Sequence, residues 1–180
     1  MRYRPAVPAE ADAVLSLVAD GRAALRALDI DQWQGGNPTA EEIEADLANG
    51  RTRVAVGDDG RLLGTLAFVV GEPDYDRVLS GAWRVESPND PARGEPRYAA
   101  LHRLCVSARA KRQGVATFMV RQACEEARGL GLAAVRADTH EGNLPMQRTF
   151  EKCGMARCCT VDITNSLEST KLRLGYEIAL

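Results

Sequence analysis

Hydrophobic positions along the chain follow two different periods, and each period predicts a different kind of element. A spacing of three to four residues predicts amphipathic helices, whereas alternation or a short apolar run predicts strands. Helical spacing covers residues 9–28, 39–50, 113–131 and 144–153. Strand patterns cover residues 2–6, 51–56, 61–70, 98–106, 132–138, 155–163 and 170–178. Strands alternating with helices in this order predict an α/β protein, with a mixed sheet covered by helices on both faces.

Short local signals define the ends of several elements. Thr39 with Glu42 three residues later forms a capping box, so a helix is expected to begin there. Asn49-Gly50 is typical of a helix end. Asp59-Gly60 separates two strand-like runs, and this dipeptide predicts a β-hairpin.

The stretch from residue 72 to residue 97 is the least regular part of the chain. It holds four prolines, and we expect a short helix near residues 78–83. Leu79 and Trp83 are poor linker residues, so we interpret the stretch as an insertion over the sheet.

Composition limits the classes of function. A length of 180 residues predicts one domain over residues 1–180, which buries enough surface to fold without a disulfide or metal. The balance of 23 basic and 25 acidic residues argues against a broad nucleic-acid surface. No apolar run approaches the ~18 residues of a membrane span, and residues 1–5 lack a signal-peptide pattern. The 5 cysteines form no Cys-x-x-Cys pair, which favours reduced thiols. We therefore expect a cytoplasmic protein that binds no nucleic acid, membrane or metal.

The segment after the strand at residues 98–106 has the features of a phosphate-binding turn. Lys111 and Arg112 add positive charge, and Gly114 begins a helix whose first N–H groups are free to bind an anion. Gly114 and the small Ala116 let a ligand approach the backbone closely. The segment lacks the Gly-Lys-Ser/Thr of a Walker A motif and the three glycines of a dinucleotide fingerprint. It therefore predicts a diphosphate site other than these two, or else a strand-to-helix turn with solvated basic residues.

Two segments together resemble the GNAT superfamily of N-acetyltransferases. Lys111-x-x-Gly114-x-Ala116 is similar to the family pattern Gln/Arg-x-x-Gly-x-Gly/Ala, with Lys in the first place. The run from Asn143 to Met155 is similar to Asn-x-x-Ala-x-x-x-Tyr-Glu-Lys-x-Gly-Phe. The resemblance implies the GNAT acyl-CoA N-acyltransferase fold, with a mostly antiparallel central sheet, and acetyl-CoA as co-substrate.

The resemblance also implies where coenzyme A would bind. The backbone of Leu104 and Val106 would pair with the pantetheine arm, and the Leu104 N–H would face the thioester carbonyl as an oxyanion-type donor. Asn143 would hydrogen-bond the arm, and Phe150 would pack against it. The pyrophosphate would be held at Lys111, Arg112, Gln113, Gly114, Val115, Ala116 and Thr117.

The residues expected to assist proton transfer depart from the family pattern. The family's usual base position holds Ala100, but His102 lies two residues on, and strand alternation predicts that it shares a face with Ala100 and Leu104. Histidine titrates near neutral pH, so His102 is a candidate base, or else a structural histidine within the sheet. His140 is an alternative base or a lining residue of the acceptor pocket. The family's proton-donating tyrosine is replaced by Phe150, so the thiolate would leave unassisted or another group would protonate it.

The acceptor side is predicted from a loop and from the insertion. Gln32, Trp33 and Gln34 lie between the first two helices, where they would line the substrate pocket, although Trp33 could instead close the core beneath the loop. Trp83 is a further candidate for this pocket. We expect acetyl transfer to a primary amine, either a small molecule or a peptide N-terminus, with a homodimer as a possible assembly. The alternatives are a non-catalytic acyl-CoA-binding or regulatory module, and an unrelated nucleotide-binding protein.

Overall fold

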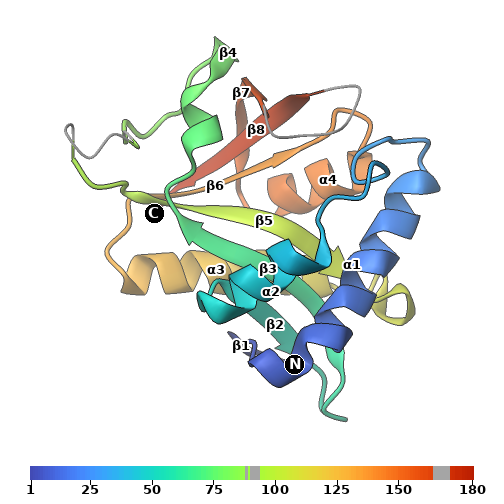
Figure 1. The fold of residues 1–180 in the computed structure, drawn as a ribbon. Helices are drawn as coiled ribbons and strands as arrows, with labels where there is room; N and C mark the ends of the chain where they lie inside the picture. Colours follow the sequence, from blue (N-terminus) through green and yellow to red (C-terminus); the bar gives the residue numbers. More distant parts are fainter. Residues whose placement is uncertain (88, 90–93, 164–170) are drawn as a thin grey trace.

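The computed structural model describes residues 1–87, 89, 94–163 and 171–180. Its strands form one eight-stranded sheet in the order β1-β2-β3-β5-β6-β8-β7-β4 (Figure 1). The β5–β6 pair is parallel and the other neighbouring pairs are antiparallel, which confirms the mostly antiparallel mixed sheet. The strands are β1 (Arg2–Pro5), β2 (Thr52–Val56), β3 (Leu62–Val70), β4 (Val78–Gly81), β5 (Tyr98–Val106), β6 (Ala134–Thr139), β7 (Ala156–Asp162) and β8 (Leu172–Ala179).

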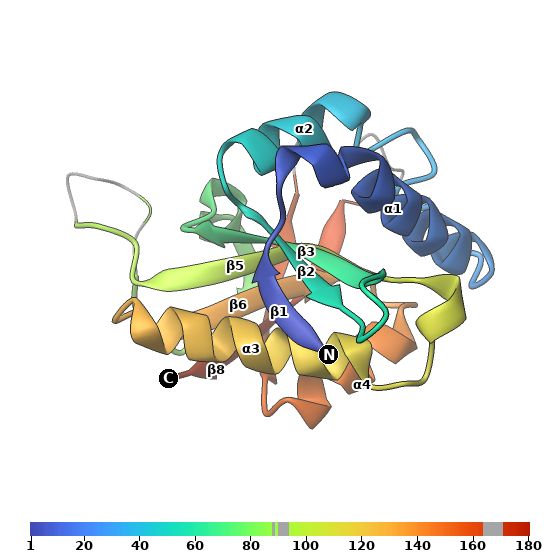
Figure 2. The ribbon, with the colours of Figure 1, turned by 90° about the horizontal axis from the view of Figure 1, so that it is seen from below.

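Helices cover both faces of the sheet, as the sequence predicts (Figures 1 and 2). α1 (Ala11–Arg26) and α2 (Ala40–Ala48) lie on one face, and α3 (Val115–Gly129) and α4 (Leu144–Lys152) lie on the other. Each face has its own hydrophobic core because each helix buries one stripe of its surface. In α3 the buried stripe consists of Val115, Met119, Val120, Ala123, Cys124 and Ala127.

The predicted caps and hairpin are confirmed. Thr39 Oγ1 accepts the backbone N–H of Glu42, whose carboxylate accepts the Thr39 N–H at 2.7 Å. The Asp59-Gly60 turn joins β2 to β3, and Gly60 has a φ of 81° that favours glycine. Within the described part of the chain, no helix is long and apolar enough to cross a membrane.

The short helix expected near residues 78–83 is absent, and that expectation is wrong. Residues 78–81 form the edge strand β4, which pairs with β7, while a single 3-10 turn, η2, lies just before it at Pro73–Asp76. Pairing with an existing strand stabilises so short a segment more than an isolated helical turn would, because the first turn of a helix is costly to form. The pairing partner is distant in sequence, so local patterns do not reveal it.

Two other predicted boundaries differ from the structure. α3 begins at Val115 rather than at residue 113, because Gly114 has a left-handed φ of 78° that no helical residue adopts. The last strand is described from Leu172 onward. Thr170 and the expected polar turn before it lie outside the described residues.

Candidate active site

β5 and β6 separate halfway along their length. Their parallel pairing ends at Leu101 and Ala137, after which β5 continues beside β3 and β6 continues beside β8. In the described chain, the β6-facing edge of β5 is therefore left without a neighbouring strand from residue 102 to residue 106. An unpaired strand edge offers N–H and C=O groups to an extended ligand. The resemblance described above implies that the pantetheine arm would pair with this edge, through Leu104 and Val106.

A one-residue bulge interrupts β5 where the two strands separate. The register with β3 shifts between Thr65 and Ala67, so Arg103 and Leu104 lie opposite a single residue. Arg103 takes a left-handed backbone, with a φ of 54°. A residue other than glycine is strained there by about 1–3 kcal/mol and stays only when its surroundings hold it.

The bulge changes which side chains share a face. His102 lies on the same face as Ala100, where it contacts Tyr75 with ring centroids 5.8 Å apart. Leu104 packs into the core beneath α3, on the opposite face. The expectation that His102 shares a face with Leu104 is therefore wrong, because the extra residue inverts the alternation of side chains. The backbone of Leu104 still lies at the open edge of β5.

The α3 N-terminus forms the second part of the site. Gly114 and Arg112 both have left-handed backbones, with φ values of 78° and 63°, which turn the chain sharply into the helix. Within the described residues, the N–H groups of Val115, Ala116 and Thr117 have no hydrogen-bond acceptor. A side chain at Gly114 would meet open space, so a ligand could reach the backbone there. These amides and the positive end of the helix dipole suit a phosphate group.

The side chains flanking this turn leave it open. Lys111, Arg112 and Gln113 are exposed, and the Gln113 amide donates back to the carbonyl of Arg109 at 3.1 Å. Lys111 and Arg112 therefore add positive charge without covering the helix N-terminus. This geometry fits the residues to a diphosphate-bearing ligand such as coenzyme A.

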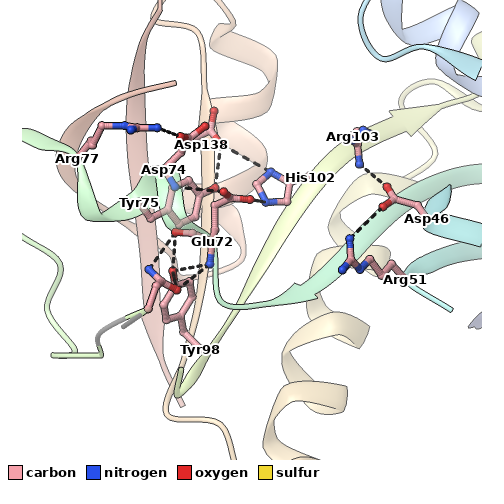
Figure 3. Close-up of polar contacts among 11 residues, drawn as sticks. Asp46, Arg51, Glu72, Asp74, Tyr75, Arg77, Tyr98, His102, Arg103 and Asp138 are labelled. Carbon is pink, nitrogen blue, oxygen red and sulfur yellow. Dashed lines mark hydrogen bonds and ion pairs between the residues drawn. The ribbon is translucent and has the colours of Figure 1, made fainter. Parts of the chain in front are cut away.

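Two carboxylates approach the imidazole of His102 from different elements (Figure 3). Nε2 lies 3.0 Å from Oε2 of Glu72, which belongs to the insertion, and Nδ1 lies 4.0 Å from Oδ1 of Asp138 on β6. The Tyr75 hydroxyl donates to the same Asp138 oxygen at 2.8 Å. All three ionisable side chains remain partly exposed, at 21 % for His102, 24 % for Glu72 and 12 % for Asp138. The imidazole therefore lies between two carboxylates.

The surroundings shift the proton affinities of two members of this group. Burial alone would raise the pKa of Glu72, but the hydrogen bond and charge of His102, the Asp74 N–H and the charge of Arg103 bring this pKa below its ordinary value. Burial, followed by the charge of Asp138 and the hydrogen bond to it, raises the pKa of Tyr75 well above that of a free tyrosine. Glu72 is thus an anion, and Tyr75 is a neutral donor near neutral pH.

The insertion reaches the site because a buried ion pair holds it against the sheet. Arg136 Nε donates to Glu177 Oε1 at 2.9 Å, and both side chains are almost fully buried. The other oxygen of Glu177 accepts the backbone N–H groups of Arg84 and Val85. The guanidinium of Arg136 also lies 4.5 Å from the ring centroid of Trp83. These contacts fasten the far end of the segment that supplies Glu72 and Tyr75.

A second ion pair lies on the other side of His102. Asp46 on α2 is buried and binds the guanidinium of Arg103, and it lies 3.8 Å from the guanidinium of Arg51 (Figure 3). The helix over this face is therefore tied directly to the bulged residue of β5.

Sequence reasoning missed the residues that the fold brings to His102 from elsewhere. Glu72 and Tyr75 lie in the irregular insertion, where no motif spacing relates them to His102. Asp138 lies at the end of a predicted strand, and no motif spacing relates it to His102 either. In the described part of the chain no group of three or more His, Cys, Asp or Glu side chains could hold a metal. The unusual density of Glu, Asp and Tyr in residues 72–76 was the one signal available.

Comparison with known proteins identifies the family of this chain. The model of the acetyltransferase (GNAT) family matches residues 22–155. The chain belongs to the GNAT acetyltransferase family. Members of this family generally use acetyl-CoA.

Individual relatives show how far the similarity extends. A GNAT-family acetyltransferase from Streptococcus agalactiae has a TM-score of 0.84 and 29 % identity, covering 99 % of this chain and 95 % of that chain. A ribosomal-protein-alanine N-acetyltransferase from Brucella melitensis shares the fold, with a TM-score of 0.67, 18 % identity and 100 % of both chains covered. GCN5-related N-acetyltransferase 6, chloroplastic, from Arabidopsis thaliana is 39 % identical over 61 residues, which are 34 % of this chain and only 21 % of that protein.

In this GNAT chain, the residues expected near the pantetheine arm have structural contacts of their own. Asn143 caps α4, and its Oδ1 accepts the Met146 N–H at 3.3 Å, which leaves its Nδ2 as a donor for a ligand. Phe150 is buried in the core and packs against Tyr176, with ring centroids 5.3 Å apart. It offers neither a proton nor an exposed surface.

His140 has a defined place at the start of α4. Its Nδ1 accepts the backbone N–H of Gly142 at 3.0 Å, and its carbonyl accepts the Asn143 N–H. Ile30, from the loop after α1, lies beside the same turn. His140 therefore stabilises the turn before α4. Because this hydrogen bond occupies Nδ1, Nε2 is the nitrogen that remains for contact with an acceptor.

Hydrogen bonds of the Gln34 side chain stabilise the loop between α1 and α2. The Gln34 side chain accepts from Arg26 and donates to the carbonyls of Arg22 and Gln32. Trp33 packs at the margin of the core beneath α1, where its ring lies next to Gly21. These contacts match the alternative interpretation of Trp33, and acceptor binding by Gln32, Trp33 and Gln34 stays a prediction.

Trp83 lies on the opposite side of the site, against the sheet. Its indole N–H donates to the Tyr75 carbonyl at 2.7 Å, and its ring covers Gly175 on β8. The tryptophan thus fixes the turn that carries Tyr75. Any contact of Trp83 with an acceptor also stays a prediction.

Proposed function

We propose that this GNAT protein transfers the acetyl group of acetyl-CoA to a primary amine by direct attack, with His102 as the base. The observation that carries the proposal is the placement of the Glu72–His102–Asp138 group where β5 and β6 separate, at the open edge of β5. The acceptor is a small-molecule amine or a peptide N-terminus. The Brucella melitensis protein of the same fold is named for acting on ribosomal-protein alanine, which supports including peptide N-termini.

Binding of the co-substrate rests on backbone groups. The free N–H groups at the start of α3 would hold the pyrophosphate, with Lys111 and Arg112 adding charge. The open edge of β5 would align the pantetheine arm, and the Leu104 N–H would donate to the thioester carbonyl. Such a donor contributes about 2.7–4 kcal/mol when it is aimed at the developing negative charge. Acetyl-CoA supplies the acetyl group in activated form, as a thioester.

Proton transfer is assigned to a specific nitrogen of His102. A neutral imidazole with its proton on Nε2, 3.0 Å from the ionised Glu72, would turn the lone pair of Nδ1 towards Asp138. An acceptor ammonium near Asp138 would give its proton to Nδ1, directly or through a water molecule, and the neutral amine would then attack the thioester carbonyl. The imidazolium that forms would lie between two carboxylates. Tyr75 would hold Asp138 in place through its hydroxyl.

The leaving thiolate has no assigned proton donor in this proposal. Phe150 has none to give, but a thiol with a pKa of about 8.5 is an adequate leaving group near neutral pH. The same residue, together with Ala100, supports the second candidate function, a non-catalytic acyl-CoA-binding module.

Three measurements on the purified protein separate these functions: thiol release, calorimetric binding of coenzyme A and stabilisation by ligands. The purified protein is mixed with acetyl-CoA and a panel of small amines and short peptides with free N-termini, and free thiol is followed with time. Amine-dependent thiol release that is lost in His102→Ala supports the transferase. Tight binding of coenzyme A by calorimetry, without turnover on any amine, supports the binding module instead. Stabilisation by NAD or ATP but not by acetyl-CoA would contradict both, and light scattering on the same sample would test the proposed homodimer.

A further inference from the structure

Arg103 combines a left-handed backbone with a buried ion-pair partner. It is the bulged residue of β5, held at a φ of 54°, and its guanidinium binds the buried carboxylate of Asp46 on α2. An arginine in a left-handed backbone tends to return to an extended one. The ion pair to α2 opposes that return, because an extended backbone at this position would carry the guanidinium away from Asp46.

The position of the bulge determines what both of its neighbours do. His102 on one side faces Glu72 and Asp138, and Leu104 on the other side packs beneath α3 while its backbone lies at the open edge. If the bulge lay elsewhere in the strand, the His102 and Leu104 side chains would change faces or lose their present contacts.

We propose that the Asp46–Arg103 ion pair is a positioning device that locks the β5 bulge, and thereby holds the His102 imidazole and the Leu104 N–H in register for catalysis. The proposal rests on the proposed function, since it names the residues that orient its base and its backbone donor. Arg103 and Asp46 act through the backbone and do not touch the reacting atoms.

A different role for Arg103 must be separated from this one. Its charge is one of the influences that lower the pKa of Glu72, so removing it could alter the base electrostatically. Glycine distinguishes the two roles, because it adopts a positive φ without strain but carries no charge. Alanine removes the charge and also disfavours the bulge.

The test compares Arg103→Ala with Arg103→Gly, using Arg51→Ala as the matched control. Arg51 also lies near Asp46 but is not part of the bulge. We expect Arg103→Ala to lower kcat by about 10- to 100-fold, the scale of a misplaced catalytic group, with little change in coenzyme A affinity. We expect Arg103→Gly to recover most of the loss and Arg51→Ala to behave like the wild type. A glycine variant as slow as the alanine variant would overturn the proposal in favour of a charge effect.

The ion pair itself is tested in two backgrounds. Asp46→Asn should lower kcat in the otherwise wild-type chain but leave it unchanged in the Arg103→Gly chain, where no lock is needed. An equal effect in both backgrounds would mean that Asp46 only stabilises α2, and the proposal would be wrong.

Hydrogen exchange gives a readout that needs no enzymatic activity. Amides of residues 101–106 should exchange faster in Arg103→Ala than in Arg103→Gly at matched global stability. If the wild type turned over no amine, the proposed function would fail, yet this exchange difference would still support the lock. Equal exchange in the two variants would overturn it.

Discussion

Nε2 of His102 lies 3.0 Å from Oε2 of Glu72, although one belongs to a central strand and the other to an irregular insertion. This contact leaves Nδ1 to face Asp138. Within the described residues Nε2 is buried and forms no hydrogen bond, so the contact with Glu72 is an ion pair when the imidazole is protonated. The contact gives the proposed base a defined position between two carboxylates.

Replacing His102 by alanine should lower turnover by about 100-fold or more, within the range for loss of a general base. It should also remove the limb of the pH–rate profile near neutrality. Glu72→Gln should lower turnover less than His102→Ala does, because the base is kept and only one of the two carboxylates beside it becomes a neutral amide. Both variants are measured as kcat/KM between pH 5 and 9. An unchanged profile for His102→Ala would contradict the assignment.

Glu72 also makes stability depend on pH. Its pKa in the folded protein lies below the ordinary value of about 4.3, so its contribution is fully present above that value and is lost as pH falls through the folded-state pKa. Glu72→Gln should therefore lower the free energy of unfolding at pH 7. It should also make that free energy fall less steeply as the pH is lowered. Urea midpoints between pH 7 and pH 3 measure this effect. Glu44→Gln, at an exposed position on α2, is the control and should leave the slope unchanged.

Gly114→Ala should weaken coenzyme A binding beyond its effect on folding. Gly114 and Gly131 have similar left-handed backbones, with φ values of 78° and 72°, and neither has an atom within 4 Å of an added Cβ. Alanine at either position should therefore lower the free energy of unfolding by about 1 kcal/mol. Only at position 114 would the added methyl group lie next to the free N–H groups at the start of α3. Calorimetric titration with coenzyme A should show weaker binding for Gly114→Ala alone; equal affinities would contradict a phosphate site there.

The buried pair of Arg136 and Glu177 should be costly to break from one side. Arg136→Met leaves an unpaired buried carboxylate, which should lower the free energy of unfolding by about 3–5 kcal/mol. Adding Glu177→Gln should recover part of this loss, because the amide oxygen still accepts the N–H groups of Arg84 and Val85. Urea denaturation of the three proteins measures the difference. A double variant no more stable than Arg136→Met would show that the charge of Glu177 is not the source of the cost.

The sequence predicted those parts of the site that depend on local signals. The turn into α3 was recognisable from Gly114 and the basic residues before it, because a left-handed glycine at a helix start is a local requirement. The His102 side chain was recognisable as a candidate, but its face relative to Leu104 was not. A single bulged residue inverts the alternation of a strand, and nothing around Arg103 signals it: the residue held in a left-handed backbone is an arginine rather than a glycine.

The sequence by itself determined the order of elements outside residues 72–97, the hairpin, the helix caps, the glycine turn into α3 and the resemblance that the family model confirms. These follow from periodicity and from residues whose backbone preferences act within a few positions. The tertiary structure alone decided that residues 78–81 join the sheet as an edge strand, that Glu72 and Tyr75 arrive beside His102, and that Asp46 reaches the bulge. Each of these depends on contacts between segments distant in the chain, where the free energy comes from packing and charge pairing rather than from local propensity.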